Sequence, residues 1–156
     1  MSYGEPTARS WRLLRGVLIL VVVAGLAFDA YVHLDLASDY DPVRTDTLSQ
    51  GDLFRVESAL AILAALLLLV RPRRWTAAFA ALVAGGGLAA VLLYRYVDVG
   101  QIGPIPSMYE PTWYTEKTNS AIAEGVAFVA AVVLVLLPWR RPARSTVPSH
   151  RRGAAG

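Results

Sequence analysis

Four long runs of apolar residues constrain the fold of this chain more than any other feature of its sequence. They cover about residues 13–34, 53–70, 75–97 and 119–137. An α-helix rises about 1.5 Å per residue, so a run of about 20 residues spans the roughly 30 Å hydrocarbon core of a bilayer. A soluble domain would instead spread its apolar residues with the period of a helix or a strand. The sequence therefore predicts an all-α fold, a four-helix transmembrane bundle.

The basic residues predict how the helices cross the membrane. Most arginines lie before the first run, in the short connector 71–74 and after residue 138. Lys and Arg near the ends of spans stay on the cytoplasmic side. The two long connectors hold mainly acidic residues, namely Asp35, Asp39, Asp41, Asp46, Asp52, Asp98, Glu110 and Glu116. We therefore predict an antiparallel up-down bundle with both termini in the cytoplasm.

The segments that flank the runs divide the chain into a membrane domain and two tails. We expect residues 1–10 to be a cytoplasmic tail, residues 11–138 the membrane domain, and residues 139–156 a disordered, basic cytoplasmic tail. The arginines ahead of the first run also fit a secretory signal, with a cleavage site at residues 25–27. Because that run is longer than a usual signal core, we interpret it as a span.

Composition removes several classes of function. The chain has no cysteine, which excludes disulfides, thiolate catalysis and iron–sulfur clusters. Its net charge of +3 lies in residues next to the spans, so we predict no nucleic-acid partner. No nucleophile elbow, Walker loop or dinucleotide fingerprint is present. His150 lies in the tail, far from His33, so no haem is indicated, and we predict no cofactor.

Ionisable residues enter the apolar runs at a shared depth. Asp29, Glu57 and Glu124 each lie four or five residues inside a span, which places them roughly 6–8 Å below its outer end. A charged side chain that faces lipid costs a few kcal/mol or more, so these groups should point inward and pair. Arg55 and Arg95 are the expected partners of the acids. We call the predicted set the polar layer: Asp29, His33, Arg55, Glu57, Tyr94, Arg95 and Glu124.

The polar layer has two interpretations. It is either an outward-facing pocket roofed by the two long connectors or a layer of salt bridges and hydrogen bonds that clamps the bundle and fixes helix register. The pocket predicts a non-enzymatic module that binds a small polar ligand, a lipid headgroup or a partner protein. An alternative is a proton-coupled transporter component in which Asp29, Glu57 or Glu124 changes protonation; four thin spans would then need a homo-oligomer or a membrane partner. A further alternative is an enzyme that uses His33 as a base oriented by a carboxylate.

A metal site is a weaker possibility. Asp29 and His33 are four residues apart and share one helical face, which is a workable ligand spacing. Glu57 and Glu124 could complete a set of nitrogen and oxygen ligands. The chain lacks the repeated Glu-x-x-His pairs of di-iron bundles, and the two arginines compete for the acids. We therefore keep these four residues as candidates and predict no metal.

Two further segments carry structural predictions. Gly85, Gly86 and Gly87 lie in an Ala-rich span, and small residues allow the close approach of another helix, within or between chains. Residues 98–118 contain three prolines and several aromatic residues, which favours an ordered cap at the membrane boundary. Thr118, Asn119 and Ser120 are candidate N-cap residues of the last span.

Three motifs carry a resemblance to known sequences. They are Tyr31–Leu36 (YVHLDL), Leu53–Glu57 (LFRVE), and Gly103–Pro111 (GPIPSMYEP) with its continuation to Thr118. In these motifs the chain resembles a group of small four-span integral membrane proteins of actinobacteria, over about residues 11–138. No activity is established for that group. The resemblance therefore implies a four-span topology and a bacterial plasma-membrane location, and it carries over no catalytic residue.

Overall fold

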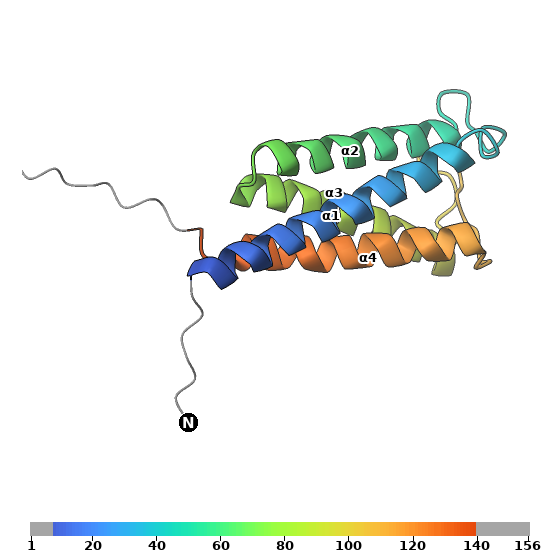
Figure 1. The fold of residues 1–156 in the computed structure, drawn as a ribbon. Helices are drawn as coiled ribbons and strands as arrows, with labels where there is room; N and C mark the ends of the chain where they lie inside the picture. The colour runs from blue at the N-terminus through green and yellow to red at the C-terminus, as the bar shows by residue number, and fades with distance from the viewer. Residues whose placement is uncertain (1–7, 140–156) are drawn as a thin grey trace, which may run out of the picture.

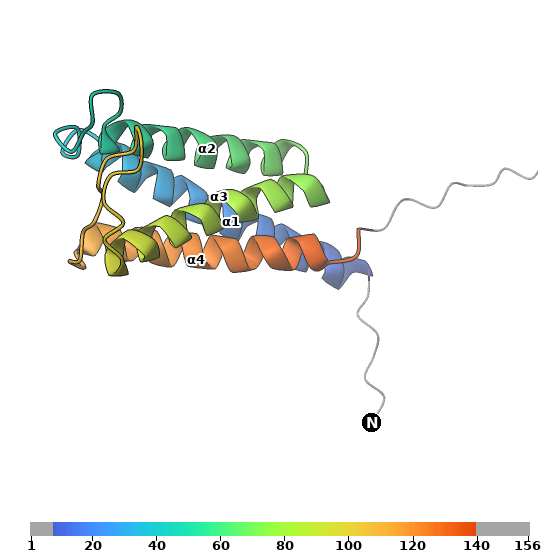
Figure 2. The ribbon, with the colours of Figure 1, turned by 180° about the vertical axis from the view of Figure 1, so that it is seen from behind.

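The chain folds into four α-helices in a computed structural model that describes residues 8–139. The helices are α1 (Ala8–Leu36), α2 (Gln50–Val70), α3 (Arg74–Tyr96) and α4 (Thr115–Leu136). α1 packs against α2 and α4, and α3 packs against the same two helices. Successive helices run in opposite directions (Figures 1 and 2). No strand occurs within residues 8–139, so the predicted all-α four-helix bundle is confirmed.

All four helices are long and apolar enough to cross a membrane. Large apolar side chains also cover the outside of the bundle, where Leu20, Leu82 and Val129 are each more than half exposed. A soluble bundle would turn polar residues outward instead. The chain is therefore a multi-pass membrane protein whose exposed apolar side chains suit lipid.

The core between the helices is made mainly of alanine. Ala61, Ala64, Ala77, Ala80 and Ala127 are completely buried. Small residues allow helix backbones in a membrane to approach closely, which increases van der Waals contact. Gly25 of α1 is the clearest case, because a Cβ there would lie 2.9 Å from the carbonyl oxygen of Ala123 on α4.

The glycine triplet of α3 makes the close contact that the sequence predicts, and it does so within the chain. A Cβ at Gly85 would lie 2.8 Å from the Phe128 ring of α4, and one at Gly87 would overlap the Glu124 carboxylate. Gly86 has open space beside it. Two of the three glycines are therefore needed for the packing of α3 against α4.

Three helices begin three or more residues earlier than predicted, and α3 begins one residue earlier. Residues 8–10, expected in the tail, form the first turn of α1. Trp139 of the predicted C-terminal tail donates its indole N–H to the carbonyl of Leu134, and residues 1–7 and 140–156 lie outside the described residues. α2 begins at Gln50 rather than residue 53, because Ser49 and Asp52 form a capping box. α4 begins at Thr115 rather than residue 119.

The predicted N-cap of α4 was wrong because its hydroxyl groups have other partners. Thr118 donates to the carbonyl of Tyr114 one turn earlier, at 2.9 Å. Ser120 donates across the bundle to Asp29 Oδ1, at 2.5 Å. Tyr114 occupies the N-cap position without a side-chain hydrogen bond.

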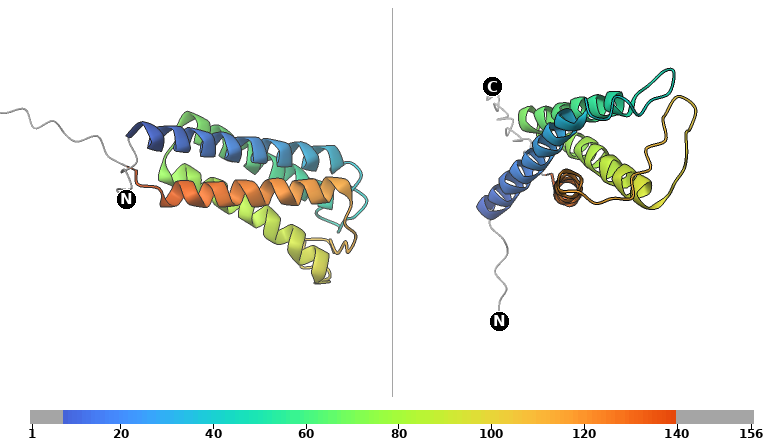
Figure 3. Two further views of the ribbon diagram at one scale, coloured as in Figure 1. Left: turned by 60° about the horizontal axis from the view of Figure 1, so that its bottom comes forward. Right: turned by 90° about the vertical axis from the view of Figure 1, so that its right-hand side faces the viewer.

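The two long connectors, residues 37–49 and 97–114, meet at one end of the bundle, which we call the connector end (Figure 1). Thr45 donates to the carbonyl of Pro104 at 2.9 Å, and the hydroxyls of Tyr40 and Tyr114 are 2.8 Å apart. The amide of Glu110 donates to the carbonyl of Tyr94 on α3. These bonds make the connectors an ordered cap, as expected. α3 diverges from α1 and α4 toward this end (Figure 3).

Candidate functional site

Three ionisable side chains meet inside the bundle near the connector end. Asp29 and His33 lie one helical turn apart on α1, and Glu124 comes from α4. Asp29 and Glu124 are 0% exposed, and His33 is buried too. One ligand atom from each lies within 4.8 Å of those of the other two. We call these residues the Asp–His–Glu cluster.

Hydrogen bonds orient the histidine of this cluster. His33 Nδ1 lies 3.0 Å from Asp29 Oδ1 and 3.1 Å from the Asp29 backbone oxygen. A backbone oxygen can only accept, so Nδ1 carries the proton and donates to it. The other ring nitrogen, Nε2, is then free to accept a hydrogen bond or to bind a ligand. The Phe54 ring packs edge-on against the imidazole, with 4.9 Å between centroids.

The carboxylates near His33 are poorly satisfied. Asp29 Oδ2, Glu57 Oε1 and both oxygens of Glu124 are buried and have no hydrogen-bond partner. Asp29 Oδ1 alone accepts from Ser120 and His33. An ionised carboxylate buried without a partner costs several kcal/mol. Either a proton or a bound cation would relieve this cost.

Gly87 brings the fourth helix into this arrangement. A Cβ at position 87 would overlap Glu124 Oε1 and lie 3.2 Å from Glu57 Oε1. The carboxylates of α2 and α4 therefore approach each other across the bare backbone of α3. Any larger residue would push them apart.

The arginines of the polar layer lie elsewhere, which corrects the predicted pairing. Arg55 is 44% exposed and forms a two-bond ion pair with Asp41, at 2.8 Å for each bond, and a weaker one with Asp52. The connector folds back over the start of α2 and places Asp41 within reach of Arg55. This guanidinium lowers the pKa of Asp41.

Arg95 also fails to pair with the buried acids. Its guanidinium lies over the rings of Tyr96 and Trp113, at 5.0 and 5.7 Å from their centroids. Within residues 8–139 no ion pair joins Arg95 to a carboxylate. Among the described residues neither arginine therefore pairs with Asp29, Glu57 or Glu124, whereas hydrogen bonds from Ser120 to Asp29 and from Ser58 to the Ala30 carbonyl do join neighbouring helices.

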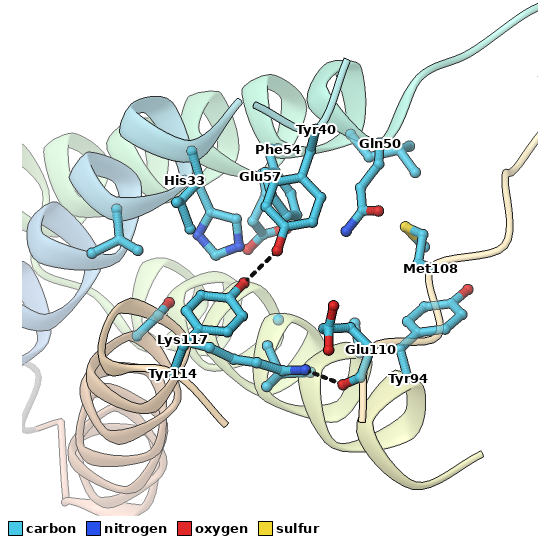
Figure 4. A pocket seen from close by; sticks show the side chains of 17 residues that line it. His33, Tyr40, Gln50, Phe54, Glu57, Tyr94, Met108, Glu110, Tyr114 and Lys117 are labelled. Atoms are coloured by element: carbon cyan, nitrogen blue, oxygen red, sulfur yellow. Dashed lines mark hydrogen bonds between the residues drawn. The ribbon is translucent and has the colours of Figure 1, made fainter. Parts of the chain in front are cut away.

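A cavity of about 170 Å³ opens beside the cluster at the connector end. His33 and Glu57 lie on one side of it, and Lys117, Glu110 and Tyr94 lie on the other (Figure 4). Lys117 Nζ donates to the Glu110 carbonyl at 2.5 Å. Apolar side chains of α1, α2 and α3 make up most of the remaining wall.

Tyr114 and Glu110 at the cavity rim have shifted pKa values. Burial and the hydrogen bond with Tyr40 raise the pKa of Tyr114, so its hydroxyl stays protonated. The amide of Thr112 donates to the Glu110 carboxylate and lowers the pKa of Glu110. The rim therefore presents the neutral phenol of Tyr114 and the ionised carboxylate of Glu110 at neutral pH.

The structure separates the seven predicted site residues into three groups. His33, Glu57 and Tyr94 line the cavity, whereas Asp29 and Glu124 lie behind its wall in the cluster. Arg55 and Arg95 belong to neither group.

Sequence reasoning missed Ser120 and Lys117. A signal was present, because residues 117, 120 and 124 share one face of a helix and Lys117 is the only lysine in the chain. Because α4 was predicted to begin at residue 119, Lys117 was placed in the connector and not on this helical face. Once α4 begins at Thr115, the lysine, the serine and Glu124 follow each other along it.

Comparison with known proteins supplies no relative for this site. No known protein family, curated protein or solved structure matches the chain. The resemblance to small actinobacterial four-span proteins therefore stays a prediction. The arrangement within residues 8–139 describes a multi-pass membrane protein in which an Asp–His–Glu cluster lies beside a cavity at one end of the bundle.

Proposed function

We propose that the chain is a non-enzymatic membrane protein that binds a small ligand in the cavity at the connector end. The single observation that carries this proposal is the cavity itself, into which all four helices and both connectors contribute side chains. A cavity of about 150 Å³ in another protein holds one benzene molecule. The volume here therefore suits a ligand of about six to ten non-hydrogen atoms.

The polar groups of the wall define the chemistry of the ligand. Glu57 Oε1 is buried and has no donor, and His33 Nε2 is free to accept because Nδ1 donates to Asp29. Lys117 donates one of its three N–H bonds to the Glu110 carbonyl, so it is the two unpartnered acceptors that decide the ligand class. The ligand should therefore carry a hydrogen-bond donor, such as an amine or hydroxyl group, on an apolar body.

The charge pattern supports a location for this function. Arginines cluster at residues 71–74, at the end of the bundle opposite the connectors, and acids predominate in the connectors. By the positive-inside rule the cavity opens on the outer side of a bacterial plasma membrane. A soluble small molecule or the head of a lipid can reach it there.

A panel of small amines and alcohols tests the proposal. Protein in lipid nanodiscs should unfold at a higher Tm with at least one of them. Glu57→Gln should lower the affinity for that ligand about 10- to 100-fold, because a hydrogen bond to a charged acceptor contributes about 1.5–3 kcal/mol. Glu116→Gln is the matched control, since Glu116 is exposed in the same bundle. Equal ligand affinity in wild type and Glu57→Gln would contradict the proposed site.

A further inference from the structure

We propose that Asp29, His33 and Glu124 bind one divalent transition-metal ion, with Glu57 available as a further ligand. This inference goes beyond the cavity ligand and does not rest on it. The ligand atoms of the three residues lie within 4.8 Å of one another. Around an ion with bonds of about 2.0–2.2 Å, ligand atoms lie roughly 3–4.4 Å apart. Side-chain adjustments of a few tenths of an ångström therefore complete the site.

The unpartnered oxygens are the second, independent observation. Asp29 and Glu124 are completely buried, yet Asp29 Oδ2 and both oxygens of Glu124 have no hydrogen-bond donor. Polar atoms in a lipid-surrounded bundle have no bulk water to satisfy them. A cation bound between α1 and α4 satisfies these oxygens at once.

No other cation reaches these oxygens among the described residues. Arg55 is held by Asp41 and Asp52, and Arg95 lies over aromatic rings. Lys117 donates to a backbone carbonyl rather than to Glu124. The arginines that we expected to compete for the acids therefore lie elsewhere. The missing Glu-x-x-His pairs count against a di-iron centre but not against a single ion.

The donor set selects the class of metal. One imidazole with two or three carboxylates suits Zn²⁺, Fe²⁺ or Mn²⁺, which accept mixed nitrogen and oxygen ligands. Ca²⁺ and Mg²⁺ prefer ligand sets made of oxygen alone. The chain has no cysteine, so the thiolate ligands that favour copper(I) are absent.

The surroundings provide support and access for the ion. Ser120 donates to Asp29 Oδ1 and fixes the orientation of that carboxylate. Gly87 leaves space for the Glu124 and Glu57 carboxylates to approach the same point. His33 and Glu57 also line the cavity, which gives an entry path from the connector end.

Metal binding by chelator-treated protein in nanodiscs tests the proposal, with Zn²⁺ and Mn²⁺ as probes. Equilibrium dialysis with elemental analysis should give one ion per chain, and the ion should raise Tm. Glu124→Gln and Asp29→Asn should each lower the affinity at least about 100-fold, because each removes a direct ligand. Gly87→Ala should also lower it, although it removes no ligand. Glu116→Gln should bind as wild type does.

The outcomes separate a metal site from a buried cluster whose carboxyl groups are neutralised by protons and bind no ion. Wild-type protein that binds neither ion overturns the proposal, as does unchanged affinity in both Glu124→Gln and Asp29→Asn. Should one variant fail to fold, the affinity of the other variant and the number of ions bound by the wild type still test whether the metal site exists. Loss of the metal with retained binding of the amine or alcohol would leave the cavity function standing.

Discussion

The two halves of the bundle use polar groups in opposite ways. In the half near residues 8 and 139, the Thr76 hydroxyl donates to the carbonyls of Arg71 and Arg73, and the Trp139 indole donates to the carbonyl of Leu134. In the half near the connectors, Asp29 and Glu124 are buried with unpartnered oxygens. Arg15 of this half donates to the carbonyl of Pro138 at 2.8 Å, and its Nε is the only buried polar side-chain atom without a partner among the described residues of this half. Alanine and leucine fill most of the remaining core there. The second half has unmet bonding capacity beside a cavity, which is typical of a binding site.

The largest expected effect comes from removing packing in the first half. Leu68 of α2 is 0% exposed there, whereas Leu66 on the same helix is 54% exposed to lipid. Leu68→Ala should lower the free energy of unfolding by about 2–4 kcal/mol, because the cavity left behind loses van der Waals contacts. Leu66→Ala is the control and should cost far less. Denaturation in mixed micelles measures the free energy of unfolding of both variants. Equal losses in the two variants would contradict tight packing around Leu68.

A smaller effect of opposite sign is expected in the second half. In metal-free protein, Glu124→Gln should raise the free energy of unfolding by about 1–2 kcal/mol, because it removes a buried carboxylate that has no partner. Added Zn²⁺ or Mn²⁺ should then stabilise the wild type and leave the variant unchanged. The same micelle assay with and without metal measures this. A loss of stability in metal-free Glu124→Gln would instead indicate a structural clamp.

The smallest effect is expected at the surface of the connector end. Arg55 lowers the pKa of Asp41 below its ordinary value of 3.8. The ionised form of Asp41 is therefore favoured in the folded protein. Its contribution to the free energy of unfolding is fully present above pH 3.8 and is lost as pH falls through the lowered pKa. Asp41→Asn should lower Tm slightly at neutral pH and not at all in strong acid. A Tm difference that is independent of pH would show that this ion pair contributes nothing.

The fold could be predicted from the sequence because it depends on the hydrophobicity of segments about 20 residues long rather than on single residues. Four apolar runs of sufficient length can only be helices in a bilayer, and short or acidic connectors then dictate an antiparallel order. Helix ends were less predictable. The start of α4 depends on which partner the hydroxyls of Thr118 and Ser120 choose, and Ser120 bonds to a residue 91 positions away.

The site was predictable only in part, for a related reason. Depth along a helix places Asp29 and Glu124 at one level, and burial then forces them inward. Arg55 has a long side chain near a helix end, so the course of the connector decides its partner, and that course placed Asp41 beside it. The cavity depends on how far α3 diverges from α1 and α4, and no local sequence pattern predicts that divergence.

Gly87 has a consequence for how this protein varies among species. A single methyl group at that position would overlap the Glu124 carboxylate and crowd that of Glu57, so we expect glycine at position 87 and glutamate at positions 57 and 124 to be retained or lost together. Relatives that retain both acids should retain the glycine, and lineages that lose Glu124 should become free to replace it. Such covariation offers a signature for finding distant relatives that share the site.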